Sequence, residues 1–156
     1  MMNSAFGTLV SKIKYNQCVM VGHPLSGKKS LMQHYQLCPD EFSYYKSLKF
    51  NIWDLFNKDA PIMQYYFTNV KAVIFVYEII NLNSELLLKL SNYEELQNAS
   101  FLILINKVDL TTEPNIIEIQ NKLQTEKIKQ KWRIQMCSAK TGLGVWEGLE
   151  WLDKNL

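Results

Sequence analysis

The fold of this chain is decided by one stretch, Gly22-His23-Pro24-Leu25-Ser26-Gly27-Lys28-Lys29-Ser30. It keeps the spacing G-x-x-x-x-G-K through Lys28, in which glycines let backbone N–H groups close around phosphate oxygens. An apolar run at residues 17–21 precedes the stretch, and residues 28–36 follow it with the apolar spacing of a helix. A strand, a glycine-rich loop and a helix in this order predict a nucleotide phosphate site formed by residues 22–30.

The residue after the loop lysine departs from the pattern. This position normally carries a hydroxyl that ligates Mg²⁺, and here it is Lys29. An ammonium cannot ligate a metal ion, and it adds positive charge where the dication would lie. Ser30 has a hydroxyl, but it lies about 100° further round the helix and is expected to point elsewhere. Magnesium binding is therefore left open: Lys29 either supplies the positive charge of the metal itself or turns to solvent.

Length and composition favour one soluble domain. The chain has 156 residues, of which 47% are hydrophobic and 21% charged, as in ordinary globular proteins. A net charge of +2 is too small to indicate a nucleic-acid partner. The three cysteines lack metal-ligand spacing and their odd number does not suit a disulfide framework, so we expect no disulfide and an intracellular location. No apolar run approaches the ~18 residues of a membrane-spanning helix.

Residues 1–14 predict an N-terminal amphipathic helix, followed by a single domain over residues 15–156. Within residues 3–14 the apolar side chains repeat at helical spacing: Phe6, Leu9, Val10 and Ile13. This face either packs on the domain or contacts a membrane or a partner. The first 39 residues hold four lysines and no acidic residue, which suits a membrane-facing segment in a cytoplasmic or membrane-peripheral protein. A mitochondrial presequence is less favoured, because the first strand begins near Asn16.

Apolar patterns further along the chain predict a sheet. Residues 48–53 alternate apolar and polar side chains, as a half-buried strand does, and Tyr44-Tyr45 is the expected hairpin partner. Residues 72–77 and 101–105 are continuous apolar runs, which is typical of central parallel strands covered on both faces. Residues 133–137 form the expected last strand.

Helical spacing separates these strands. The apolar stripes of three helices are Leu86, Leu90 and Tyr93; Ile116, Ile119 and Leu123; and Val145, Leu149 and Leu152. Thr112 is expected to cap the second helix, with Pro114 in its first turn. Strands that alternate with helices predict an α/β fold with a mostly parallel, doubly wound sheet, which binds ligands at the carboxyl ends of its strands.

Three more motifs lie at predicted strand ends. Asp54 follows the strand over 50–53, where a carboxylate can hold a Mg²⁺-bound water. The aspartate of Asn106-Lys107-Val108-Asp109 can accept hydrogen bonds from N1–H and N2–H₂ of guanine, while the stem of Lys107 lies over the base. A backbone N–H of Ser138-Ala139-Lys140 can meet guanine O6. Each motif alone can be an ordinary surface loop, but four motifs in this order indicate a guanine-nucleotide site.

With these motifs the chain resembles the small GTPases, and among them the Arf-like (ADP-ribosylation-factor-like) branch. The resemblance rests on residues 22–28, Trp53-Asp54, 66–69, 73–76, 106–110, 137–139 and 145–152. It implies the P-loop GTPase fold, with a mostly parallel six-stranded sheet, one antiparallel edge strand and about five flanking helices. It also implies that the chain binds GTP or GDP, and that residues 3–14 are the N-terminal amphipathic helix of Arf relatives.

Departures from the family pattern fall on metal binding and catalysis. The stretch Asp54-Leu55-Phe56-Asn57-Lys58 stands where the family has D-x-x-G-Q. Asn57 therefore holds the position whose N–H meets the γ-phosphate, and it keeps that N–H. Lys58 replaces the glutamine that orients the attacking water, and an ammonium cannot both donate and accept as an amide does. Only residues 37–42 remain for the first switch loop, and they contain no threonine to complete a metal shell. Asp54, acting through water, is the one metal contact we expect if Mg²⁺ binds.

These residues leave three functions open, and with them the question of enzymatic activity. We favour a guanine-nucleotide-binding protein that serves as a protein-interaction or assembly module with little or no hydrolysis. The first alternative is a structural subunit of a larger complex, such as a membrane complex, with a vestigial or permanently occupied site. The second is a slow GTPase switch that a partner protein completes. Aromatic residues near the second switch region, Tyr44, Tyr45, Tyr65, Tyr66 and Phe67, are candidate partner contacts, although Phe67 is expected in the core.

Overall fold

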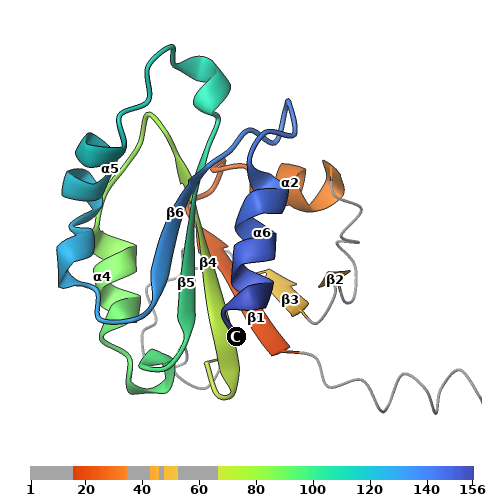
Figure 1. The fold of residues 1–156 in the computed structure, drawn as a ribbon, viewed down its shortest axis with the longest axis vertical. Coiled ribbons are helices and arrows are strands. Elements are labelled where there is room, and N and C mark those ends of the chain that lie inside the picture. The colour runs from red at the N-terminus through yellow and green to blue at the C-terminus, as the bar shows by residue number, and fades with distance from the viewer. Residues whose placement is uncertain (1–15, 35–42, 46–47, 53–66) are drawn as a thin grey trace, which may run out of the picture.

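The computed structural model describes residues 16–34, 43–45, 48–52 and 67–156 (Figure 1). The strands within these residues are β1 Asn16–Gly22, β2 Ser43–Tyr45, β3 Leu48–Ile52, β4 Val70–Glu78, β5 Ser100–Asn106 and β6 Trp132–Met136. They form one six-stranded sheet in the order β2-β3-β1-β4-β5-β6. All neighbours pair in parallel except β2 and β3, so β2 is an antiparallel edge strand. The predicted α/β fold with a mostly parallel sheet and an antiparallel edge strand is confirmed.

Four α-helices lie in the described residues: α2 Lys28–His34, α4 Glu85–Ser91, α5 Ile116–Leu123 and α6 Val145–Lys154. Three short 3₁₀ helices accompany them: η1 Glu94–Leu96, η2 Val108–Leu110 and η3 Thr125–Lys127. The predicted helix over residues 3–14 lies outside the described residues, so the expected total of about five helices is tested only in part. None of the helices that the structure describes is long and apolar enough to cross a membrane.

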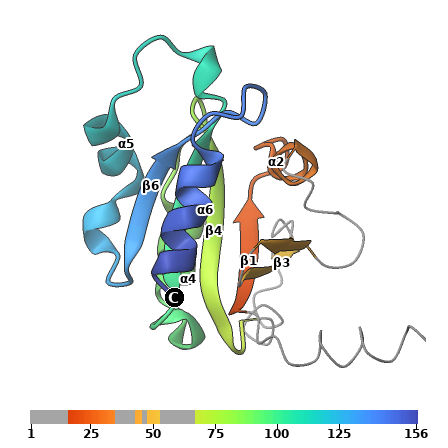
Figure 2. The same cartoon turned by 45° about the vertical axis from the view of Figure 1, so that its right-hand side comes forward.

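Helices cover both faces of the sheet. α4 and α5 lie on one face, and α2 and α6 lie on the other (Figures 1 and 2). Successive residues of β4 alternate between the two layers: Val73, Phe75 and Tyr77 pack with α4 and α5, whereas Ala72, Ile74 and Val76 pack with α2 and α6. Every residue of β5 is buried as well. The continuous apolar runs therefore form central strands, because both of their faces are covered.

The terminal helix matches its predicted stripe. Val145, Leu149 and Leu152 of α6 are all buried against the sheet. Trp151 also packs against this layer, whereas Trp146 is 44% exposed. One of the two helix tryptophans is therefore a packing residue and the other lies at the surface.

The predicted start of α5 is wrong. Thr112 does not cap the helix; the N-cap is Asn115, whose Oδ1 accepts the backbone N–H of Ile117 at 3.0 Å and of Glu118 at 3.3 Å. Pro114 stands before the cap instead of in the first turn, because a proline disfavours the helical conformation at the residue before it. Ile119 and Leu123 are buried as expected, but the late start leaves Ile116 39% exposed.

The predicted stripe of α4 also needs correction. Leu87 and Leu90 are the fully buried leucines, and Leu86 is only partly buried. Tyr93 lies beyond the last residue of the helix and packs beside Phe67, with ring centroids 5.5 Å apart. Phe67 itself is fully buried, as expected. The buried face of α4 is therefore formed by Leu87 and Leu90, three residues apart, and it begins one residue later than predicted.

Two cysteines are buried in the layer that packs with α2 and α6. Cys18 on β1 and Cys137 after β6 belong to one apolar cluster, and both are free thiols. Burial raises the pKa of each thiol from 9.0 to about 12, and the Asp153 carboxylate adds to the rise at Cys18. Both thiols are therefore protonated at neutral pH. Cys38 lies outside the described residues.

We expect Gly144→Ala to destabilise the fold much more than Gly148→Ala. Gly144 precedes α6 at a φ of 77°, and an added Cβ would lie 2.0 Å from the carbonyl oxygen of Met136. The left-handed backbone and the clash together cost about 2–4 kcal/mol. Gly148 lies inside α6, where a Cβ meets no backbone atom but side-chain atoms of Leu104, Gln135 and Leu102 at 3.1, 3.2 and 3.4 Å, and where alanine gains helix propensity. Urea unfolding measures both variants, and equal losses of free energy would contradict this interpretation.

Candidate functional site

The phosphate loop, residues 22–28, leaves β1 at the carboxyl edge of the sheet. The strand order runs outward from β1 in two directions, to β3 and to β4, and a switch point of this kind leaves a crevice beyond the strand ends. β5 and β6 run parallel to the central strands and therefore end at the same edge, at Asn106 and Met136 (Figure 1). The structure thus brings the loops over 22–28, 106–109 and 138–140 to one edge of the sheet.

The phosphate loop fits closely against its neighbours. Gly22 has no room for a side chain, because a Cβ there would lie 2.3 Å from the carbonyl oxygen of Val76. Lys28 is buried, and its Nζ donates to the carbonyl oxygens of Gly22 at 2.8 Å and His23 at 2.7 Å. Pro24 and Leu25 form the exposed tip of the loop. The ammonium of Lys28 is therefore held on carbonyl oxygens at the start of the loop whose N–H groups the motif places around phosphate.

Asn106 joins three loops through one buried side chain. Its Nδ2 donates to the carbonyl oxygen of Ser26 at 2.9 Å, and its Oδ1 accepts the backbone N–H of Ala139 at 3.0 Å. Gly27 permits this approach, since a Cβ on it would lie 2.2 Å from Nδ2. The side chain is 1% exposed, so both of its polar atoms need partners, and both have them. Asn106 therefore fixes the phosphate loop relative to the loop after β6.

The other residues predicted to bind guanine lie around Asn106. Asp109 is exposed, and its Oδ1 accepts the hydroxyl of Ser138 at 2.6 Å, which orients the carboxylate. Lys107 has a left-handed backbone with a φ of 62°, and its Nζ donates to Oε1 of Glu78 at 2.7 Å. Both charged side chains of the motif are therefore held by partners from other loops or strands.

These residues line one cavity of about 330 Å³. Its lining residues are Gly27, Ser30, Asn106, Lys107, Asp109, Leu110, Ala139 and Lys140. All but Leu110 are among the residues predicted to bind a nucleotide; the signal for Leu110 was its place directly after Asp109. The volume falls in the range of small-molecule sites, ~300–1,000 Å³. Sequence-predicted residues from three separate loops therefore converge on one cavity.

Two residues outside the predicted motifs contact them. Glu78, the last residue of β4, pairs with Lys107, and the side chains of the two are 20% and 31% exposed. Asn83 Nδ2 lies 3.3 Å from Nε2 of His23 in the phosphate loop. The one sequence signal for Glu78 was an acidic residue at the end of a buried apolar strand. Its partner lies 29 residues away, so no local pattern indicated the contact.

The residues predicted for metal binding and catalysis are only partly within the described structure. Lys29 is exposed, and it has no hydrogen bond or ion pair with another of the described residues. No group of three or more His, Cys, Asp or Glu side chains able to hold a metal ion is present among residues 16–34, 43–45, 48–52 and 67–156. Asp54, Asn57 and Lys58 lie outside these ranges, so their roles stay predictions.

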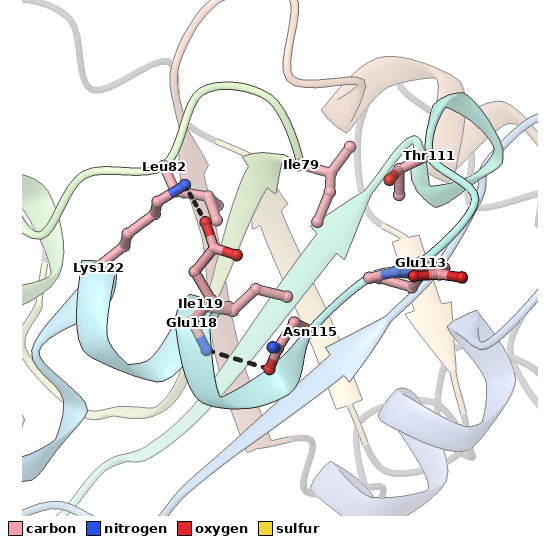
Figure 3. Close-up of a pocket in the computed structure, with 9 residues that line it drawn as sticks. Ile79, Leu82, Thr111, Glu113, Asn115, Glu118, Ile119 and Lys122 are labelled. Carbon is pink, nitrogen blue, oxygen red and sulfur yellow. Dashed lines mark hydrogen bonds and ion pairs between the residues drawn. The ribbon is translucent and has the colours of Figure 1, made fainter.

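A second cavity of about 130 Å³ lies between the loop after β4 and the start of α5 (Figure 3). Three of its polar side chains have partners: Glu118 pairs with Lys122 at 2.7 Å, and Asn115 caps the helix. Ile79 and Ile119 contribute apolar surface to it. It shares no residue with the cavity at Asn106. The larger cavity combines Gly27 of the phosphate loop with charged side chains from the loops after β5 and β6, so it is the candidate site.

A phosphate loop after the first strand of a switch-point sheet, joined by Asn106 to the loops after β5 and β6, defines a P-loop protein of the α/β class. The chain matches the ADP-ribosylation factor (Arf) family over residues 2–156, and it belongs to that family. The family consists of GTP-binding small GTPases, so the predicted family is confirmed. The match does not test the departures at Lys29, Asn57 and Lys58.

We expect Asn106→Asp to lower both stability and guanine-nucleotide affinity. The variant keeps the acceptor for the Ala139 N–H, but it replaces the donor to Ser26 with an oxygen. Two oxygens then face each other in a buried site, which costs about 1–3 kcal/mol. Titration with a fluorescent GDP analogue should show a rise in Kd of about five- to 150-fold, by the rough conversion of that energy. Asn98→Asp, at an exposed asparagine, is the matched control. Wild-type stability and affinity in Asn106→Asp would contradict the role of the shared amide.

Glu78→Gln should weaken guanine-nucleotide binding without unfolding the protein. The glutamine retains an oxygen acceptor but loses the charge that holds the Lys107 ammonium, so the lysine stem is less fixed beside the cavity. We expect Kd to rise by about three- to tenfold, with a smaller effect for Glu78→Asp. Glu118→Gln removes an exposed ion pair of the same 2.7 Å length, which does not line the candidate cavity, and should leave Kd unchanged. Equal affinities for Glu78→Gln and Glu118→Gln would exclude a positioning role for Glu78.

Proposed function

We propose that this Arf-family chain binds GTP or GDP and serves as a protein-interaction or assembly module, with little or no hydrolysis of its own. The proposal rests on a contrast between the residues for nucleotide binding and the residues for catalysis. Gly27 and Ser30 of the predicted phosphate site line one cavity with residues predicted to recognise the base, whereas the sequence places lysines at the metal-ligating and water-orienting positions, Lys29 and Lys58. Binding groups are kept and catalytic groups are lost.

Guanine recognition is supported by the orientation of the Asp109 carboxylate. Guanine offers two donors, N1–H and N2–H₂, on one edge, and a carboxylate is the side chain that accepts both. The hydroxyl of Ser138 holds Oδ1 of Asp109 at 2.6 Å, so the carboxylate is oriented before any base arrives. Adenine presents no such pair of donors on that edge, and the proposed site therefore selects guanine.

The loss of hydrolysis is supported by what the lysines cannot do. Phosphoryl transfer depends on metal and donor groups that stabilise charge and on a residue that orients the attacking water. Lys58 has donors only, so it cannot accept a hydrogen bond from that water. Asn57 keeps its backbone N–H for a γ-phosphate, which favours contact with the nucleotide over its cleavage. A protein that binds a nucleotide without cleaving it acts through its contacts with other proteins.

The structural-subunit alternative also has an observation in its favour. The Ala139 N–H is bound by Asn106, and the Asp109 carboxylate is bound by Ser138, so the motif residues also brace the sheet edge. In a protein whose nucleotide site is vestigial, these bonds would still stabilise the edge of the sheet. Both functions include two further proposals. Residues 3–14 contact a membrane or a partner, and the protein is cytoplasmic or peripheral to a membrane.

Nucleotide content distinguishes the two functions. Purified protein is heat-denatured and the supernatant is separated by anion exchange, with a mock-purified sample as blank. We expect about one GDP or GTP per chain in the wild type and none in Lys28→Ala, which removes the buried ammonium of the phosphate loop. In Asp109→Asn we expect loss of guanine nucleotide, since an amide places a donor against the guanine donors. An empty wild type that also fails to bind added GDP and GTP would overturn the proposal in favour of the structural subunit.

A single-turnover assay then tests the second half of the proposal. GTP-loaded protein is incubated with Mg²⁺ and phosphate release is followed. We expect release no faster than from the same amount of GTP incubated with the mock-purified sample in the same buffer. Hydrolysis well above that level, or hydrolysis switched on by a cell extract, would instead support the slow GTPase that a partner completes.

A further inference from the structure

The side chains at the phosphate loop do not provide the oxygen ligands that a divalent cation needs. The residue that directly follows Lys28 is a lysine, which has three donors and no acceptor. Ser30, the next hydroxyl, lines the cavity beside Gly27 and Asn106 instead. Oxygen ligands are what Mg²⁺ requires, and it tolerates little departure from octahedral geometry. The carboxylate of Asp54 alone, beyond the described residues, is a poor substitute for a ligand set.

Two cationic side chains follow the loop in succession, and they differ in their environment. Lys28 is 4% exposed and its ammonium is fixed on the carbonyl oxygens of Gly22 and His23. Lys29 is exposed, on the first turn of α2, and no carboxylate of the described residues pairs with it. Of the acidic residues at the site, Glu78 is paired with Lys107, and Asp109 accepts the hydroxyl of Ser138. The ammonium of Lys29 is therefore uncommitted within the described part of the site.

The chemistry of a lysine suits it to a phosphate. Its charge is a compact ammonium on a flexible four-carbon stem, so it can follow an anion without a rigid ligand geometry. A second cation beside the loop offsets the negative charge of a diphosphate, as a bound metal would, and it also repels a dication brought to the same place. The same side chain thus supplies positive charge and excludes magnesium.

We propose that this chain binds guanine nucleotide without a divalent cation, and that the Lys29 ammonium contacts the phosphates in place of Mg²⁺. The inference rests on the proposed nucleotide binding, and it adds that this binding requires no divalent cation. It commits to one ligand class, a guanosine di- or triphosphate free of metal. It also gives a reason for the lysine at a position where a small hydroxyl residue is expected.

The test compares nucleotide binding with and without metal in the full-length protein. Nucleotide-free protein is titrated with a fluorescent GDP analogue in excess Mg²⁺ and in excess EDTA, and dissociation is followed under both conditions. We expect wild-type Kd and dissociation rate to agree within about twofold between the two buffers. Lys29→Gln should raise Kd at least about tenfold in EDTA, as the loss of a charged phosphate contact implies. Lys71→Gln, at an exposed lysine of β4, is the matched control and should bind as the wild type does.

A gain-of-dependence variant supplies the second readout. Lys29→Ser restores the hydroxyl and removes the charge, and we expect Mg²⁺ to tighten its binding at least about tenfold. Electron paramagnetic resonance with Mn²⁺ should show bound ion in the Lys29→Ser–GDP complex and none above free nucleotide in the wild-type complex. Thermal melts verify that the variants fold.

Each outcome separates the two proposals. Release of nucleotide from the wild type by EDTA, or bound Mn²⁺ in its complex, overturns metal-free binding but leaves nucleotide binding intact. Wild-type affinity of Lys29→Gln in EDTA overturns the role of Lys29. Absence of binding in both buffers, with a normal melt, overturns the proposed function itself.

Discussion

The hydrogen bonds of one buried amide hold the site together. Asn106 donates to the phosphate loop at Ser26 and accepts from the loop after β6 at Ala139, and its own backbone ends β5. An amide is suited to this place because it has a donor and an acceptor, and burial makes both of them costly to leave unpaired. Gly27 is required for the same reason, since any side chain there would displace the amide. Three loops that are far apart in the sequence thus share one fixed geometry.

Sequence patterns predicted the sheet better than the helices. The apolar runs in β4 and β5 are unambiguous, because strands covered on both faces leave no room for polar residues. Short helices carry weaker signals: Thr112 and Asn115 are both acceptable caps, and the choice depends on Pro114 between them. In the site, motif residues were predictable because phosphate and base contacts require fixed spacing. Glu78 was not, because its partner is distant in the sequence and is found only in the folded chain.

The Arf-family site of this chain divides into two ends. At the end predicted to bind the base, the amide of Asn106, the carboxylate of Asp109 and the ammonium of Lys107 each have a partner that orients them. At the metal end, the sequence offers ammonium groups where hydroxyl and amide groups are expected. Preorganised groups lower the cost of binding, whereas catalysis requires groups complementary to a transition state. The two ends are consistent with a protein in which holding a ligand, not transforming it, is the function.

The burial of Cys137 has a consequence for how the site behaves under oxidising conditions. This residue directly precedes Ser138, and its Sγ lies 3.9 Å from Oδ1 of Asn106. Oxidants and electrophiles react with the thiolate, and burial raises the pKa of the Cys137 thiol to about 12, so the thiol is protonated at neutral pH. The edge of the sheet at the candidate site therefore contains a cysteine that stays buried and protonated while the chain is folded, and such a thiol reacts slowly with oxidants.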